Sequence, residues 1–382
     1  MDQKSTTQVS LAELALAFLK LGTIAFGGPA AHIALMQEEF VRRRHWISEA
    51  EFLDRIAAAS LIPGPSSTEV AIFIGQTKRG WRGLVVAGTC FILSAAILVS
   101  LLAAAYVRYQ SLPQVQGMLY AIKPVVIAII LQALWSLGHS AIKTWPLALI
   151  TGVSVVLAAL SVNALLVLVA AGLASGVALW SKRGRGSASL AWPISIRFWS
   201  VPGVIATAIP FGLAGLFFSF LKVGSVVFGS GYVLLAFLRA EFVERLHWLT
   251  ERQLIDAVTV GQFTPGPVFT TATFIGYILD GIPGAVCATL GIFLPGFLLV
   301  AASGPLLHKI RQSPLAGAIL DGVVAGSLAL MAVVTWQLGK AAIVDWRSLL
   351  ICLASLAALW RYRINSAWLI GAAAVAGLVF KL

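Results

Sequence analysis

The chain has 382 residues, of which 59% are hydrophobic and 11% charged, and its formal net charge is +12. This composition excludes a soluble globular protein, because several apolar runs reach the roughly 20 residues that cross a bilayer as a helix. The positive charge does not indicate nucleic-acid binding, since the basic residues lie in short loops between apolar runs, where they orient the helices. We therefore expect an all-α polytopic protein that crosses the cytoplasmic membrane several times.

The first predicted elements are an apolar helix over Leu11–Phe26 and a short helix over Ala30–Arg43, which becomes polar toward its far end. The break between them reads Gly27-Gly28-Pro29. Proline suits the first position of a helix, so this break offers a helix start whose N–H groups have no partner within the helix.

A second break, Pro63-Gly64-Pro65, separates two predicted helices over Glu49–Ile62 and Pro65–Thr77. Ser48 and Glu51 have the spacing of a capping box, which predicts where the first of these helices begins. The first proline ends a helix, the glycine permits a sharp turn, and the second proline starts a new helix. Both helices are too short to cross the membrane, so we expect a hairpin that enters the membrane and is lined by protein.

Four longer apolar runs complete the first half of the chain. Leu84–Tyr106 and Val115–Leu137 are long enough to cross the membrane, and Pro146–Leu160 and Ala164–Trp180 are expected to cross as a tight pair. The cysteines lie in apolar segments without paired spacing, and the five histidines form no metal-binding pattern. We therefore expect no metal, disulfide or cofactor, and a packing role for Cys90, Cys287 and Cys352.

The second half of the chain repeats the first. A shift of 202 positions carries Pro63-Gly64-Pro65 onto Pro265-Gly266-Pro267, and after one deletion a shift of 201 carries Trp135 onto Trp336. The same register predicts a second capping box at Thr250. Residues 1–180 and 213–382 are therefore expected to be two transporter repeats, joined at 181–212 by a basic linker and an additional apolar segment.

Equivalent loops of the two halves carry opposite charge. The loop after the helix that follows Pro63-Gly64-Pro65 is basic, whereas the equivalent loop of the second half contains Asp280. One loop later the difference in charge is reversed, and the second half carries the basic loop. Because positive loops favour the cytoplasm, equivalent loops are expected on opposite sides of the membrane. This pattern is typical of inverted repeats, which bind substrate near the midplane where the halves meet. The basic residues are Lys78, Arg79 and Arg82 in the first half, and His308, Lys309 and Arg311 in the second.

The two PGP breaks (named after their Pro-Gly-Pro sequence) are the predicted anion site. A helix start presents N–H groups and a positive dipole to a ligand, and hydroxyl groups follow each break. The break at Phe26-Gly27-Gly28-Pro29 (the FGGP break) and its second-half equivalent are further candidates for the anion site. The predicted substrate-binding residues at the helix breaks are Pro63, Gly64, Pro65, Ser66, Ser67, Thr68, Pro265, Gly266, Pro267, Thr270, Thr271, Gly27, Gly28 and Gly229.

Five ionisable residues in these segments allow two interpretations each. Lys20 and Lys222, at equivalent places, either supply charge to an anion or extend to the membrane surface. Glu69 lies one turn after Pro65, where a carboxylate repels an oxyanion unless it carries a proton, so it is a proton-coupling candidate. Asp54 and Asp256 are the other such candidates. Each of these acids could instead favour the positive start of its own helix.

Two acidic residues have the spacing of a structural ion pair. Glu39 precedes Arg43 by four positions, and Glu241 precedes Arg245 by four, in the order that suits an ion pair along one helix face. We expect both pairs to stabilise their helices.

The run from Phe26 to His32, the run Glu38-Glu39-Phe40-Val41 and the two PGP breaks resemble the chromate ion transporter family in its long, two-half form. The resemblance covers nearly the whole chain. It implies export of chromate from the cytoplasm, with sulfate as a chemical analogue, and coupling to protons or to the membrane potential. The second half departs from the FGGP run, where it reads Phe228-Gly229-Ser230-Gly231.

Three other functions remain to be weighed against chromate export. The first is a carrier or channel for sulfate or another oxyanion, which shares the charge and shape of chromate. The second is an intramembrane enzyme acting on lipid phosphates, but the sequence contains no nucleophile–base or metal motif that such an enzyme needs. The third is a structural subunit, which has no need of two polar helix breaks. A homodimer is a further possibility for the assembly.

Overall fold

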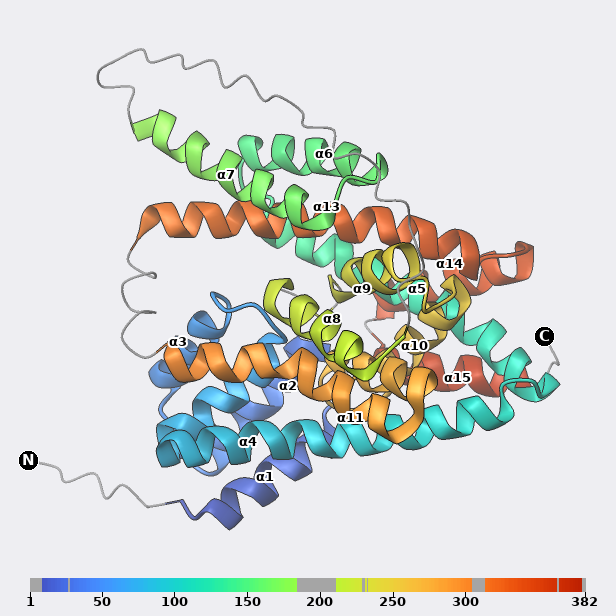
Figure 1. The fold of residues 1–382 in the computed structure, drawn as a ribbon, viewed down its shortest axis with the longest axis horizontal. Helices are drawn as coiled ribbons and strands as arrows, with labels where there is room; N and C mark the ends of the chain where they lie inside the picture. Colours follow the sequence, from blue (N-terminus) through green and yellow to red (C-terminus); the bar gives the residue numbers. More distant parts are fainter. Residues whose placement is uncertain are drawn as a thin grey trace, which may run out of the picture.

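Helices are the regular structure of the part of the chain that the computed structural model describes, namely residues 9–26, 28–183, 211–228, 231, 233–303, 313–362 and 364–379. Gly27, Gly229, most of the linker and the loop containing His308, Lys309 and Arg311 lie outside these residues. Figure 1 shows the arrangement, with α13 and the α6–α7 pair along one edge and α1 with α4 along the other.

The described elements follow the order expected from the repeat. Those of the first half are α1 (Leu11–Ile24), α2 (Gly28–Met36), the π-helix η1 (Gln37–Arg43), α3 (Glu49–Ala59), α4 (Ser66–Tyr109), α5 (Pro113–Ala141), α6 (Trp145–Ala159) and α7 (Ala164–Arg183). Those of the second half are α8 (Leu213–Val226), α9 (Leu234–Leu238), the π-helix η2 (Arg239–Arg245), α10 (Glu251–Phe263), the 3-10 helix η3 (Val268–Thr270), α11 (Thr271–Ala302), α13 (Pro314–Ala342), α14 (Trp346–Tyr362) and α15 (Ser366–Val379).

Five of the described helical segments are long and apolar enough to cross a membrane. Their outer faces expose large apolar side chains, such as Leu101 and Leu290, which a bilayer covers. The expectation of an all-α polytopic membrane protein is therefore confirmed. The five segments are Ser66–Tyr109, Pro113–Ala141, Ala164–Ser181, Val268–Ala302 and Pro314–Ala342.

The short helix predicted over Ala30–Arg43 differs from the structure in where it begins and in its type. In the structure an α-helix begins at Gly28 and continues after Met36 as a π-helix, and the second half changes to a π-helix at Arg239. Each π-helix is followed by a histidine with positive φ, at +50° in His45 and +54° in His247. The left-handed residue ends the element in both halves.

Both predicted capping boxes are present and start the hairpin helices. The Ser48 hydroxyl accepts a hydrogen bond from the Glu51 N–H at 3.2 Å, and the Glu51 carboxylate accepts one from the Ser48 N–H at 2.9 Å. Thr250 and Gln253 make the same reciprocal pair at the start of α10. Local sequence alone therefore sets where α3 and α10 begin.

The predicted hairpin around Gly64 is formed by α3 and the first arm of α4. Lys78, late in that arm, interacts electrostatically with Glu51 at the start of α3. Nearer the turn, the Arg55 guanidinium lies 6.0 Å from the ring centroid of Phe73. Each contact joins residues at similar distances before and after Gly64, so the two helices run antiparallel. The second half repeats this packing between α10 and the first arm of α11.

A second, tighter reversal divides α4 into two arms. Gly80 has a φ of +58°, which favours glycine, and the chain turns back there so that Gly75 packs directly on Gly83. A Cβ atom on either of these two glycines would overlap a backbone carbonyl of the other arm. The equivalent glycines of α11, namely Gly276, Gly281 and Gly284, repeat the turn and the contact.

The long arms of α4 and α11 pack side by side in opposite directions (Figure 1). Gly88, early in the arm of α4, abuts Phe297, which lies late in α11. Tyr106, late in α4, has its ring centroid 5.3 Å from that of Phe274. Phe274 lies in the first arm of α11, which the contact of Gly276 with Gly284 places level with the early part of the long arm. Equivalent helices of the two halves therefore run antiparallel, and the halves are inverted repeats.

Labelling of single cysteines tests this inversion. Trp81 and Ile282 are equivalent residues beside the two tight turns, and they are 72% and 69% exposed. In a background without the native cysteines, Ile282→Cys is expected to react with an impermeant maleimide on intact cells, whereas Trp81→Cys should react only after permeabilisation, because its loop is basic. Equal labelling of both positions from one side would contradict the inverted arrangement.

The remaining helices interlock the two halves. α5 of the first half packs against α14 and α15 of the second, and α13 of the second half packs against α6 and α7 of the first. The predicted tight pair α6–α7 is present, with a turn at Ser161, whose φ is +60°. The two PGP turns lie at the contact between these interlocked halves.

Candidate functional site

Each PGP turn lies against the long helix arm of the opposite half. A Cβ atom on Gly266 would overlap the side chain of Ala95, which lies midway between the Gly80 turn and the end of α4. Gly296 of α11, the repeat equivalent of Ala95, faces the carboxyl group of Glu69 beside the first PGP turn. Both turns therefore contact interior positions of the long arms, between the tight turns at Gly80 and Gly281 and the ends of α4 and α11.

Two equivalent hydrogen bonds hold the turns across the interface between the halves. The Gly64 N–H donates to the Val227 carbonyl at 2.7 Å, and the Gly266 N–H donates to the Ala25 carbonyl at 2.9 Å. Ala25 and Val227 cap the C-terminal ends of α1 and α8, where carbonyls lack partners within the helix. Each half thus supplies the acceptor that fixes the PGP turn of the other.

His32 links the two PGP segments into one hydrogen-bonded chain. Its Nε2 atom lies 3.0 Å from the Ala25 carbonyl, and its Nδ1 atom lies 3.2 Å from the Ser67 hydroxyl. A carbonyl only accepts, so Nε2 carries the hydrogen, and Nδ1 of the neutral ring accepts from Ser67. This series of hydrogen bonds therefore runs from Gly266 through Ala25 and His32 to Ser67. The repeat equivalent of His32 is Leu234, so the second half lacks this link.

The polar side chains that follow the two PGP turns are arranged differently. In the first half the hydroxyl of Thr68 and both carboxyl oxygens of Glu69 are buried and, among the described residues, have no hydrogen-bond partner. In the second half Thr270 donates to the Pro267 carbonyl at 2.8 Å, and Thr271 donates to the Val268 carbonyl at 2.7 Å. The polar atoms available to a ligand therefore gather at the first turn.

Glu69 folds back against its own turn. A Cβ atom on Gly64 would overlap the Oε1 atom of Glu69, so the carboxyl group lies directly beside the glycine. The residue is fully buried. An ionised carboxylate in such a place, without a cation or donor, is strongly unfavourable, whereas a protonated carboxyl or one facing a donor-rich ligand is not.

The helix starts contain fewer ligand donors than the sequence suggests. The Thr68 N–H turns back to the Pro65 carbonyl at 2.7 Å, and the Thr270 N–H does the same to Pro267 at 2.9 Å. The second start is a 3-10 helix before it widens into α11. The Thr68 N–H is therefore not available to an anion at the first turn, whereas the Thr68 hydroxyl, which has no partner among the described residues, is.

The lysines predicted as anion ligands lie beside acidic residues of the π-helices. Lys222 Nζ lies 2.9 Å from the Glu241 carboxylate, and Lys20 interacts electrostatically with Glu39. Both lysines are exposed. Lys222 also lines a cavity of about 300 Å³ bounded by α8, η2 and α13. The structure therefore places both lysines with carboxylate partners.

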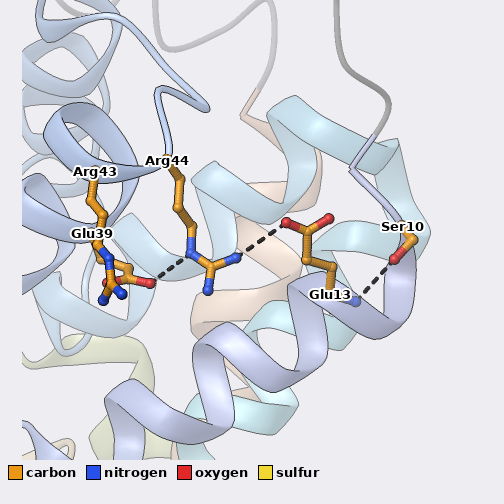
Figure 2. A network of polar contacts seen from close by, with 5 residues as sticks. All are labelled: Ser10, Glu13, Glu39, Arg43 and Arg44. Carbon is orange, nitrogen blue, oxygen red and sulfur yellow. Dashed lines mark hydrogen bonds and ion pairs between the residues drawn. The ribbon is translucent and has the colours of Figure 1, made fainter.

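The predicted ion pairs along the π-helices are confirmed. Arg43 lies 3.3 Å from Glu39, and Arg245 pairs with Glu241. In the first half Arg44 extends the network to Glu13 at 3.2 Å, as Figure 2 shows. The network ties the end of η1 to the start of α1.

The two equivalent aspartates have different surroundings. Asp54 is exposed on α3, whereas Asp256 is completely buried on α10. Lys123 of α5 lies 2.8 Å from Asp256, and the Tyr106 hydroxyl donates to Asp256 at 2.8 Å. Neither Lys123 nor Tyr106 was predicted as a functional residue. The sequence feature that could have indicated Lys123 is that it is the single lysine within the apolar run Val115–Leu137.

Comparison with protein families and known sequences agrees with the resemblance found in the motifs. The family model described as "Chromate transporter" matches residues 12–177 and 214–378. The "Chromate transport protein" of Cupriavidus metallidurans is 32% identical over 97% of this chain and 93% of that protein, and the one of Pseudomonas aeruginosa is 30% identical over the same shares. The "Probable chromate transport protein" of Synechococcus elongatus is 31% identical over 97% and 96%. No solved structure matches the chain. The chain therefore belongs to the chromate transporter family.

Proposed function

We propose that this protein is a secondary transporter that exports chromate through a site at the membrane midplane, between the segments Pro65–Thr68 and Pro267–Thr271. The observation that carries the proposal is the pair of equivalent hydrogen bonds from Gly64 to Val227 and from Gly266 to Ala25, which hold both helix breaks at the contact between the halves. The curated relatives that bear the name of chromate transport proteins support the choice of substrate.

The physical requirement is to replace the hydration of a dianion. Leaving water for the membrane interior is costly unless fixed donors take the place of the solvent. Helix starts supply such donors without introducing a fixed positive charge that would hold the anion too tightly. The hydroxyl of Thr68, which is buried and unpartnered among the described residues, is the side-chain donor closest to this requirement.

Glu69 is the proposed coupling group. Its carboxyl group lies beside Gly64, where the dianion is to bind, so the carboxyl carries a proton while the dianion is present. Proton and dianion then move in the same direction with a net charge of one negative unit. Consequently the inside-negative membrane potential drives export, and an outside-acidic pH gradient opposes it.

Asp54 and Asp256 are less suited to carry the coupling proton. Asp54 is exposed, and Asp256 already has a cation and a hydroxyl donor as partners. Sulfate is expected to compete with chromate, since the two anions share charge and tetrahedral shape and the turns present no group that distinguishes them.

Uptake of chromate into everted membrane vesicles tests this function. Energised vesicles are positive and acidic inside, so uptake in them corresponds to export from the cell. Valinomycin with potassium, which collapses the potential, is expected to abolish uptake, whereas nigericin, which collapses the pH gradient, is expected to increase it. Excess sulfate should inhibit it.

Vesicles without the protein and vesicles with the exposed-residue variant Lys143→Gln are the controls. Uptake no greater than in vesicles without the protein would refute chromate export. Inhibition by nigericin would refute the shared direction of proton and anion.

A further inference from the structure

A cavity with several polar side chains in its lining lies at one end of the helices, apart from the PGP turns. It has a volume of about 920 Å³ and is bounded by the starts of α5 and α10 and by the C-terminal ends of α13 and α15. Its polar lining consists of Gln114, Gln116, Tyr120, Lys123, Glu251 and Arg252. We call this cavity the vestibule.

The floor of the vestibule is a buried ion pair between the two halves. Lys123 belongs to the first half and Asp256 to the second, and their charged atoms lie 2.8 Å apart. The side chain of Asp256 is 1% exposed and that of Lys123 is 13% exposed. Tyr106 donates a hydrogen bond to the other oxygen of Asp256. Placing two charges in such a position is costly, and an apolar pair would pack the same space more favourably.

The repeat shows that packing alone does not require this pair. The position equivalent to Lys123 is Val324, and the residue equivalent to Asp256 is Asp54, which is exposed. The equivalent part of the other half is therefore built without a buried lysine. Ionisable residues within a membrane domain commonly line the path of an ion, and this lysine reaches the wall of an open cavity.

The charges around the vestibule leave an excess of positive charge. The Glu251 carboxylate lies 2.6 Å from Arg239, and Asp256 is paired with Lys123. A third acid, Asp345, accepts a hydrogen bond from the lining residue Tyr120 at 2.6 Å and interacts electrostatically with Arg347, so each of these acids has a cation nearby. Within the described ranges, no carboxylate lies within ion-pair distance of Arg252. The vestibule therefore presents one guanidinium group without a carboxylate partner and one ammonium group whose partner lies below it.

We propose that the vestibule is a second binding site for a tetrahedral dianion. Lys123 and Arg252 bind the oxyanion, and Asp256 is the counter-ion that Lys123 holds when the dianion is absent. When Lys123 turns to the dianion, the hydrogen bond from Tyr106 remains on Asp256. The inference rests on the proposed transport of a tetrahedral dianion, but it assigns residues that do not belong to the PGP site.

The vestibule lies on one side of the PGP turns. Tyr106, which contacts Asp256, is near the end of α4 farthest from the Gly80 turn. Asp256 lies on α10, the helix that leads into the Gly266 turn. A dianion released from the midplane toward this end of the helices therefore meets Lys123 and Arg252 before it reaches water.

The test is equilibrium dialysis of radiolabelled chromate against the full-length protein in lipid nanodiscs. The informative variant is the double substitution Lys123→Gln with Asp256→Asn, which removes both charges and leaves neither one buried without a partner. Arg252→Gln is the second variant. Lys143→Gln, an exposed lysine at the other end of α5, is the matched control. Thermal unfolding of each protein reports whether the fold is kept.

If Lys123 binds the anion, the double variant melts like the wild type but binds chromate at this site about tenfold or more weakly, because a charged hydrogen bond is lost. Arg252→Gln should weaken binding similarly, and Lys143→Gln should leave it unchanged. Wild-type affinity in the double variant would show that the pair is structural and would overturn the vestibule site alone. Failure of the wild type to bind either chromate or sulfate would instead refute the proposed substrate class, and this site with it.

Discussion

Valine in place of Gly64 is expected to reduce chromate export by about a hundredfold, because a displacement of about 1 Å in a preorganised site has effects of that size. Gly64 has a φ of +135°, which L side chains rarely adopt, and a Cβ atom would overlap the Glu69 carboxyl group. The strain contributes about 1–3 kcal/mol. Relief of that strain moves the turn away from Val227 and displaces the helix start that follows it.

Gly266→Val is expected to act in the same way, since its φ is +88° and its added atoms would overlap Ala95. Gly80→Ala is the matched control. Gly80 also has positive φ, at +58°, but open space surrounds it, so its variant carries backbone strain without disturbing the site. Chromate resistance and vesicle uptake, normalised to inserted protein, are the measurements. Normal export by both valine variants would show that the anion does not bind at the PGP turns.

Pro65→Ala and Pro267→Ala test whether the proline rings are needed in addition to the glycine turns and the helix starts. Alanine permits the same helix and adds an N–H group, so these variants should export chromate better than the glycine variants do. Loss of export as complete as in Gly64→Val would indicate that the proline rings themselves shape the site.

Glu69→Gln is expected to uncouple transport from the pH gradient. Glutamine has nearly the shape of a protonated glutamic acid, so the dianion still binds, but no proton accompanies it. Uptake into everted vesicles should then respond to valinomycin as before and no longer respond to nigericin. Because two net negative charges now move in place of one, the dependence of the rate on the membrane potential should also become steeper.

The repeat supplies a matched control for this variant. Thr271 is the residue equivalent to Glu69, and its hydroxyl donates to a carbonyl three positions earlier. Glu69→Thr is therefore expected to fold and to satisfy its own hydroxyl, again without response to nigericin. A response to nigericin that is unchanged in both variants would assign Glu69 a structural role and return the coupling step to Asp256 or Asp54.

Features set by residues close together in the chain were predictable from the sequence. The capping boxes at Ser48 and Thr250, the ion pair of Glu39 with Arg43 and the reversal at Gly64 each depend on groups a few positions apart. The membrane class follows from composition, because a bilayer requires long apolar helices. The inversion of the halves was predictable as well, since the charges of the equivalent loops record it.

The pairing of groups far apart in the chain was decided by the tertiary structure. No local pattern indicates that Gly64 donates to Val227 or that His32 joins Ala25 to Ser67, because those contacts arise only when two inverted halves pack together. The different surroundings of Asp54 and Asp256 have the same origin. The two residues are equivalent by repeat, but Asp54 is exposed whereas Asp256 is buried beside Lys123 of the other half, and a buried charge persists where such a partner reaches it.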